Sequence, residues 1–271
     1  MRCMPLLVKR ADDLETTWPT DAVRKFDARE DFANPTLDLC MNDPVAFVKR
    51  LVPRAIKDPI KEGLRRRRFA KALISFRKLQ RDCAPPEHLL EELVEAWGNE
   101  SYSAQHEYLR ELVLTVRKID GPIVECGSGL TTVLVGLEAQ RNGLKHYALE
   151  NHPEWARRIL RDLTAAGVTS TVVYETPLRS YGEYAWYDVS EVELPPKFAM
   201  AICDGPPGDT PGGRYGLVPV LQDRLDSGCL IMIDDFQREE EQAITRRWTK
   251  ETGASFTQHG TNKPFAMLRI P

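Results

Sequence analysis

The stretch Ile123-Val124-Glu125-Cys126-Gly127-Ser128-Gly129-Leu130-Thr131-Thr132 decides the fold. Its first four residues are mostly apolar and suit a short buried strand, and the Gly-x-Gly that follows permits a sharp turn. A strand that turns at glycines into a helix exposes main-chain N–H groups at the positive end of that helix. The stretch therefore predicts a strand–turn–helix unit that binds a ligand at its turn.

Downstream of this unit, short apolar runs alternate with stretches of helical length, which is typical of a parallel sheet covered by helices. We predict strands at 123–126, 146–150, 171–174, 198–203, 229–233, 255–258 and 265–270. We predict helices near 131–141, 153–166, 214–225 and 239–250. The last two strands are separated only by Gly260-Thr261-Asn262-Lys263, so one of them must run antiparallel to its neighbours.

The upstream part of the chain shows helical rather than strand patterns. Prolines, among them Pro53 and Pro59, are expected to break it into helices, with candidates at 61–81, 87–97 and 103–118. Gly98-Asn99 suits the end of the second of these. We therefore divide the chain into a helical N-terminal extension or cap, 1–99, and an α/β domain, 100–271.

Composition indicates a globular protein of a reducing compartment. The 42% hydrophobic and 28% charged residues are ordinary for a domain with a core. No apolar run approaches the ~20 residues that span a bilayer, and the first residues are too mixed for a secretory signal. Six cysteines occur singly, without a CxxC pair, which argues against disulfides or zinc. We expect a cytoplasmic protein that does not contact membranes.

Basic residues concentrate upstream. Residues 54–81 contain 11 Lys and Arg, including the run Arg65-Arg66-Arg67-Arg68, although the whole chain has a net charge of −3. Such a helix could bind nucleic-acid phosphates. Equally, its arginines could pair with acids on the downstream domain, and this second interpretation is the more frequent one.

The acid that follows the second predicted strand bears on the ligand. Glu150 lies 23 residues after Gly127, where a carboxylate can bind ribose hydroxyls. A dinucleotide fingerprint would place a third glycine at Thr132. Glu125 would also repel a pyrophosphate, but it suits the ammonium of an amino acid. These features favour S-adenosylmethionine (SAM) over NAD.

Further motifs carry a family resemblance. They are Cys203-Asp204-Gly205-Pro206-Pro207-Gly208, Gly213-Arg214-Tyr215 and Asp234-Asp235. With Glu-x-Gly-x-Gly, residues 97–271 resemble class I SAM-dependent methyltransferases, in particular bacterial small-molecule O-methyltransferase-like proteins, and are similar to plant glucuronoxylan methyltransferases. The resemblance implies a doubly wound, Rossmann-like sheet of seven strands in the order 3-2-1-4-5-7-6, with an antiparallel last hairpin.

The resemblance also implies roles for individual residues. The methionine end of SAM would lie against Glu125, Cys126, Gly127, Ser128 and Gly129. Glu150 and its neighbour Asn151 would hold the ribose, Pro177-Leu178 would lie near the adenine, and Asp204 would contact the cofactor. Cys126 and Cys203 are expected to be packing thiols.

Three acids follow adjacent predicted strands. Asp204, Asp234 and Asp235 would converge at the sheet edge, and like charges so close need compensation, for which Mg²⁺ is suited. This spacing resembles the metal site of catechol-type and macrolide sugar O-methyltransferases. The alternative is that Asp234 and Asp235 cap a helix and form solvated pairs.

The sequence does not identify the general base that would take the acceptor's proton. Those families often place Lys or His three residues after the first aspartate, where this chain has Pro207. The proton could pass to Asp204 or Asp235, or to a histidine from elsewhere in the chain. The candidate histidines are His106, His152 and His259.

The prediction that follows is SAM-dependent methyl transfer to an oxygen of a small molecule or sugar, with Mg²⁺ as the assisting ion if one is used. The aromatic residue that follows the prolines in amino-methylating nucleic-acid enzymes is replaced by Gly208. The alternatives are a nucleic-acid-binding or nucleic-acid-methylating protein of this fold and an NAD-type oxidoreductase. The N-terminal segment would cover the acceptor site or form a homodimer contact. Aromatic residues would flank the pocket: Trp97, Tyr102, Tyr181, Tyr184, Trp186 and Tyr187.

Overall fold

A computed structural model describes residues 54–98 and 104–271, with side chains from residue 61 onward. Contacts divide the chain into one unit of residues 1–60 and a second of 61–271, and the arrangement below is that of the second unit. Most of the predicted extension, together with Asn99, Tyr102 and Ser103, lies outside the described residues. The division of the chain at 99–100 therefore stays a prediction.

Among the described residues, three helices precede the sheet. They are α2 (Arg54–Arg77), α3 (Glu87–Trp97) and α4 (His106–Val116). Helix α3 has the predicted bounds and ends at Gly98, whose φ of 74° is the left-handed cap conformation that glycine permits. The predicted break at Pro59 is wrong, because α2 begins at Arg54 and continues through this proline, which removes only one backbone donor.

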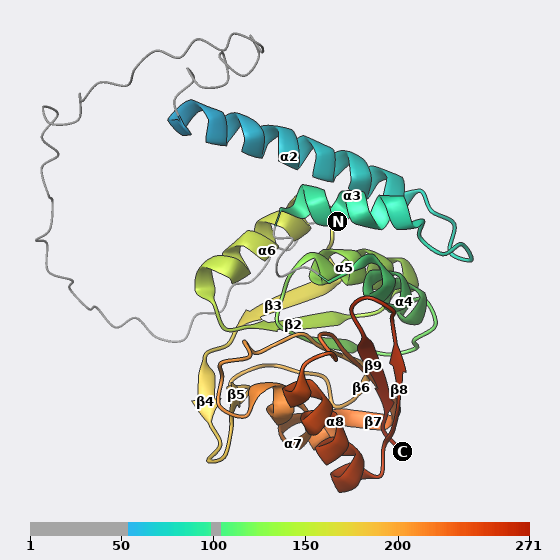
Figure 1. The fold of residues 1–271 in the computed structure, drawn as a ribbon, viewed down its shortest axis with the longest axis vertical. Helices are drawn as coiled ribbons and strands as arrows, with labels where there is room; N and C mark the ends of the chain where they lie inside the picture. The colour runs from blue at the N-terminus through green and yellow to red at the C-terminus, as the bar shows by residue number, and fades with distance from the viewer. Residues whose placement is uncertain (1–53, 99–103) are drawn as a thin grey trace, which may run out of the picture. The chain divides into compact units, whose positions relative to one another are not determined.

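The sheet has seven strands in the predicted order (Figure 1). The sequence β3-β2-β1-β6-β7-β9-β8 is the predicted 3-2-1-4-5-7-6 with two extra strands counted, so the doubly wound class is confirmed. The strands are β1 (Ile123–Cys126), β2 (His146–Glu150), β3 (Thr171–Glu175), β6 (Phe198–Cys203), β7 (Leu225–Ile233), β8 (Ser255–His259) and β9 (Phe265–Arg269). The first five in this list run parallel, whereas β9 is antiparallel to both β7 and β8.

Side chains of the central strands alternate between two cores. One core contains Ile123, Ile202 and Met232 and is closed by α4, α5 (Leu130–Asn142) and α6 (Pro153–Ala165), with α2 and α3 packed on the same side. The other contains Cys126 and Cys203 and is closed by α7 (Leu217–Leu221) and α8 (Glu239–Thr252). Figure 1 shows the two groups of helices on opposite faces of the sheet.

Two local predictions differ from the structure. The helix predicted at 214–225 is three short segments: η2 (Gly213–Gly216), α7 and η3 (Gln222–Arg224). Pro219 and the glycines at either end of η2 explain the interruption, because proline lacks a donor and glycine disfavours helix. A hairpin of β4 (Leu178–Ser180) and β5 (Ala185–Tyr187) was not predicted. Its strands of three residues are too short to show a period.

Within the described ranges, no helix is both long and apolar enough to span a membrane. The four cysteines of these ranges, Cys83, Cys126, Cys203 and Cys229, are free thiols, and all but Cys83 are buried.

Candidate functional site

The strand register brings the predicted site residues to one edge of the sheet. Cys126 of β1 is paired with Cys203 of β6, which is paired with Ile233 of β7. The next residues, Gly127, Asp204 and Asp234, therefore leave the sheet side by side at the carboxyl ends of parallel strands. Ligands of doubly wound folds bind at this edge.

The amides of the glycine loop are already bonded within the protein. Gly127 N donates to Leu149 O at 3.0 Å, Ser128 N to a Glu150 carboxylate oxygen at 3.1 Å, and Gly129 N to Thr132 Oγ1 at 2.8 Å. Thr132 replaces the third glycine of the dinucleotide motif, and its hydroxyl accepts from the amide of Gly129, the N-cap residue of α5. None of these three amides is left for a diphosphate, which binds such turns through free N–H groups.

Glu150 is held against the loop by three hydrogen bonds. Its Oε2 accepts from Ser128 N and from Ser128 Oγ at 2.6 Å, and its Oε1 accepts from His152 N at 2.8 Å. Only 5% of the residue is exposed. A carboxylate has about four acceptor positions, two on each oxygen. Oε2 uses both of its positions and Oε1 uses one, so Oε1 can still accept from a ligand hydroxyl.

Glu125 is completely buried, on the same face of the sheet as Asp204. Thr131 Oγ1 donates to its Oε1, and His146 Nε2 lies 3.1 Å from its Oε2. Oε1 is therefore bonded on the protein side of the loop, whereas Oε2, although close to His146, has no hydrogen-bond partner among the described side chains. The predicted contact of Glu125 with the ammonium of a ligand stays a prediction.

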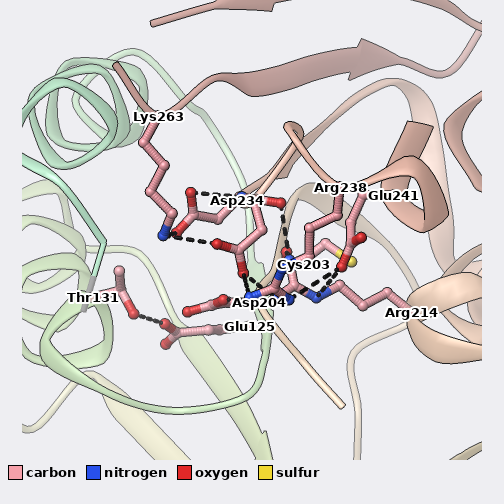
Figure 2. Close-up of polar contacts among 10 residues, drawn as sticks. Glu125, Thr131, Cys203, Asp204, Arg214, Asp234, Arg238, Glu241 and Lys263 are labelled. Carbon is pink, nitrogen blue, oxygen red and sulfur yellow. Dashed lines mark hydrogen bonds and ion pairs between the residues drawn. The ribbon is translucent and has the colours of Figure 1, made fainter. Parts of the chain in front are cut away.

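Arg214 links the acids at the sheet edge (Figure 2). The residue is 4% exposed, and its Nη2 lies 3.1 Å from Asp204 Oδ1 and 2.9 Å from Asp235 Oδ2. Its Nη1 donates to the main-chain oxygens of Cys203 and Asp234 at 3.3 and 2.9 Å. A planar guanidinium with five donors is suited to such multiple bonding. Arg214 was noticed in the sequence only as part of a motif, so its ion-pairing role was missed.

Lys263 approaches the same acids from the loop between β8 and β9. Its Nζ lies 3.0 Å from Asp234 Oδ2 and 2.8 Å from Asp235 Oδ1. Arg238 Nη2 adds a third basic contact to Asp235, at 3.1 Å. No pattern in the sequence indicates this role for Lys263, because only the pairing of β9 with β7 brings the hairpin connection to the acids.

The surroundings of Asp204 and Asp235 shift the pKa values of these two carboxyl groups in opposite directions. Burial raises the pKa of Asp204 to about 7, and the neighbouring Asp234 and Asp235 add to this while Arg214 opposes it. Burial would also raise the pKa of Asp235, but the hydrogen bond from Lys263 and the charges of its basic neighbours lower it below the ordinary value. Asp204 is also the more accessible, with 27% of its side chain exposed against 9% for Asp235.

A divalent ion fits this cluster poorly as it is arranged. Carboxylate oxygens of Asp204, Asp234 and Asp235 lie within 4.8 Å of one another, which is close enough to share an ion. Each carboxylate, however, already has an arginine or lysine partner, and Lys263 occupies the position between the last two. The charge compensation for which the sequence suggested Mg²⁺ is therefore supplied by side chains.

The capping alternative is wrong. Helix α8 follows Arg238 and has no side-chain cap, and Asp234 and Asp235 are 2% and 6% exposed rather than solvated. Asp234 Oδ1 instead accepts from Asp235 N, and Asp235 adopts a positive φ of 59°, which aspartate tolerates better than most residues.

The three candidate histidines contact other groups. His106 lies 3.3 Å from Glu87, His152 accepts from Trp155 N in the first turn of α6, and the His259 ring stacks on Phe265. Burial raises the pKa of Cys126, and raises that of Cys203 to about 12, so both are poor nucleophiles. This agrees with their expected role as packing residues.

Two tyrosine hydroxyls are buried at the site: Tyr187 was predicted to flank the pocket, whereas no pattern in the sequence indicated Tyr108. Tyr108 on α4 and Tyr187 on β5 are 1% and 0% exposed, and neither hydroxyl has a hydrogen-bond partner among residues 61–98 and 104–271. The Tyr187 hydroxyl lies against Gly205, since a Cβ added there would collide with it. Buried hydroxyls are usually bonded, so these two are candidates for ligand contact.

Tyr184, one of the aromatic residues predicted to flank the pocket, lines a separate hollow. Tyr181 stacks on Tyr184, and Tyr184 meets Tyr215 edge-on. A cavity of about 230 Å³ is lined by Glu183, Tyr184, Gly212, Tyr215, Ala243, Ile244 and Arg247. It includes none of the predicted cofactor or acid residues. Trp97 and Trp186 are buried in the cores instead.

The arginine run of α2 is largely paired. Arg65 and Arg66 contact Glu62, and Arg68 contacts Glu95. The run is therefore a paired helix face, but the acids lie on α2 itself and on α3 and not, as the sequence had suggested, on the downstream domain.

No protein-family model matches the sequence, and no curated protein matches it. Solved structures do match. A Podospora anserina methyltransferase bound to S-adenosylhomocysteine (SAH) is 14% identical, with 70% of this chain and 90% of that one covered and a TM-score of 0.52. A Bacillus cereus O-methyltransferase with SAH is 16% identical, with coverages of 69% and 92% and a TM-score of 0.48. A Geobacter metallireducens precorrin-6y C5,15-methyltransferase is 13% identical, with coverages of 64% and 92% and a TM-score of 0.48. At such identities, the likeness to the Podospora protein shows a shared fold.

Proposed function

We propose that this chain is a SAM-dependent methyltransferase that acts on an oxygen of a small molecule or sugar. The observation that carries the proposal is the loop after β1. Its three amides are bonded internally, while Glu150 beside them keeps an acceptor position. Such a turn suits a nucleoside without a diphosphate. The fold shared with an SAH-bound methyltransferase adds support.

The acceptor would bind next to Asp204. A bound SAM supplies an electrophilic methyl group, which leaves its sulfur as the acceptor oxygen forms a bond to carbon. Asp204 is the best placed of the acids to take the acceptor's proton, because it is the most accessible and has Arg214 as its only ion-pair partner among the described residues. The more heavily paired Asp235 would orient Arg214. Positioning of the two reactants is the main catalytic contribution expected of such a site.

Calorimetric titration of the full chain with SAM, SAH and NAD tests the proposal. We expect SAM and SAH to bind and NAD not to bind. Glu150→Gln should weaken SAH binding by roughly 10- to 100-fold, the equivalent of ~1.5–3 kcal/mol for a hydrogen bond to a charged group. Glu154→Gln, on the exposed start of α6, is the matched control and should bind as the wild type does.

Two results would contradict the proposal: the absence of heat with millimolar SAM and SAH, or tighter binding of NAD than of SAH. Thermal unfolding without ligand establishes that Glu150→Gln is folded. Incubation with methyl-deuterated SAM and a panel of hydroxylated compounds, read by mass spectrometry, then identifies the acceptor class.

A further inference from the structure

The loop that carries Lys263 is fixed at both ends. Gly260 opens it with a φ of 82°, and a Cβ there would lie 2.9 Å from Lys263 O. Thr261 donates through N and Oγ1 to the carboxylate of Glu107 on α4, at 2.9 and 2.7 Å. Pro264 O accepts from Phe236 N at 2.9 Å. The lysine is therefore delivered to the acids by a structured connection.

The ammonium lies where a bridging cation would bind. Its Nζ is 3.0 Å from Asp234 Oδ2 and 2.8 Å from Asp235 Oδ1. Figure 2 shows Lys263 extending toward Asp234. An ion bound by the same two oxygens would lie next to a positive charge. Like charges at such a distance in a largely buried site repel strongly.

The acidic and basic side chains around Asp234 and Asp235 nearly cancel in charge without a metal. The acids of this cluster are Asp204, Asp234, Asp235 and Glu241, and its bases are Arg214, Arg238 and Lys263. Every one of these acids has a basic group within 3.7 Å. A divalent ion added to the intact cluster would leave an excess of positive charge.

We infer that Lys263 is a built-in cation that takes the place of a divalent metal between Asp234 and Asp235. Asp234 and Asp235, which the ammonium bridges, then form a latent metal site that opens only when the ammonium is removed. The inference does not depend on the proposed methyl transfer, because metal binding is measured without SAM or an acceptor.

Titration of the full chain with Mn²⁺, by calorimetry and by electron paramagnetic resonance of the free ion, tests this inference. We expect no saturable binding of Mn²⁺ by the wild type. Lys263→Met should bind one Mn²⁺, with an affinity on the order of tenfold or more above any residual binding by the wild type. Lys263→Arg keeps the charge and should stay without metal. Lys250→Met, on the exposed end of α8, is the matched control and should behave as the wild type.

The acquired site should be lost in the double variant Lys263→Met with Asp234→Asn. Melting curves with and without Mn²⁺ give a second measurement, in which only Lys263→Met gains stability from the ion. The inference is overturned if the wild type binds Mn²⁺ as tightly as Lys263→Met does. It is equally overturned if folded Lys263→Met binds no Mn²⁺, since the acids would then not be a latent site.

Discussion

At the scale of single residues, Asp204 links the structure to a measurable pH dependence. Its pKa is about 7 in the folded chain, because burial outweighs the attraction of Arg214, whereas its ordinary value is 3.8. Between these two values the folded state holds a proton that the unfolded state has released. This residue therefore stabilises the fold fully at low pH and loses that contribution as pH rises through about 7.

Comparison with Asp204→Asn isolates this contribution. The free energy of unfolding of the wild type, minus that of the variant, should fall as pH rises from 4 to 7, by up to about 1 kcal/mol per pH unit, and should then level off. Asp209→Asn, exposed in the same loop, should leave the wild-type pH dependence unchanged. Urea unfolding at a series of pH values measures both differences. A difference for Asp204→Asn that does not change between pH 4 and 7 would refute the raised pKa.

At the scale of elements, the loops after β1 and β6 touch backbone to backbone. A Cβ at Gly205 would collide with the Tyr187 hydroxyl and lie 2.8 Å from Gly127 N, whereas one at Gly208 meets nothing closer than Arg238 at 3.8 Å. Gly205→Ala should therefore destabilise the protein by about 1–3 kcal/mol, as overpacking does, and weaken SAH binding. Gly208→Ala should change neither. Chemical denaturation and SAH titration of the pair decide this, and equal behaviour of the two variants would count against the close approach.

The helices and strands differ in how well the sequence predicts them. Strands β1, β2 and β6 and helix α3 have the predicted bounds because their hydrophobic patterns are continuous and end at glycine, proline or polar residues. The segment at 213–224 was misjudged because apolar spacing alone suggested a helix, while Pro219 and the flanking glycines interrupt it. The β4–β5 hairpin is too short for any pattern to emerge.

The cluster of Asp204, Asp234 and Asp235 could be predicted only in part, because some of its contacts arise from tertiary packing. Convergence of Asp204 and Asp234 follows from neighbouring parallel strands, which local patterns reveal. Their partners Arg214 and Lys263 come from a 3₁₀ turn and a hairpin connection, and these reach the cluster only through tertiary packing. Three converging acids indicate that their charge must be compensated, but no local pattern identifies distant side chains as the source.

At the scale of the whole molecule, the distribution of charge bears on nucleic-acid binding. The chain carries −3 overall, and three of the four arginines at 65–68 contact Glu62 or Glu95. Phosphate binding gains from the release of counterions by free cations, so each arginine already paired contributes less. We therefore expect the full chain to bind single- or double-stranded RNA and DNA no better than a non-specific protein does, with Kd weaker than about 10⁻⁶ M at physiological salt.

Fluorescence anisotropy at a series of salt concentrations measures the affinity of the full chain for RNA and DNA. A protein that neutralises Z phosphates gives a slope of log K against log salt of about −0.9 Z on duplex DNA, so the slope counts the cations in use. Substitution of Glu62 and Glu95 by Gln should release the three arginines and steepen the slope, which shows that the assay can detect them. Submicromolar binding by the wild type with a steep slope would instead favour a nucleic-acid partner. The acceptor of the proposed methyl transfer would then be sought in RNA or DNA rather than among small molecules and sugars.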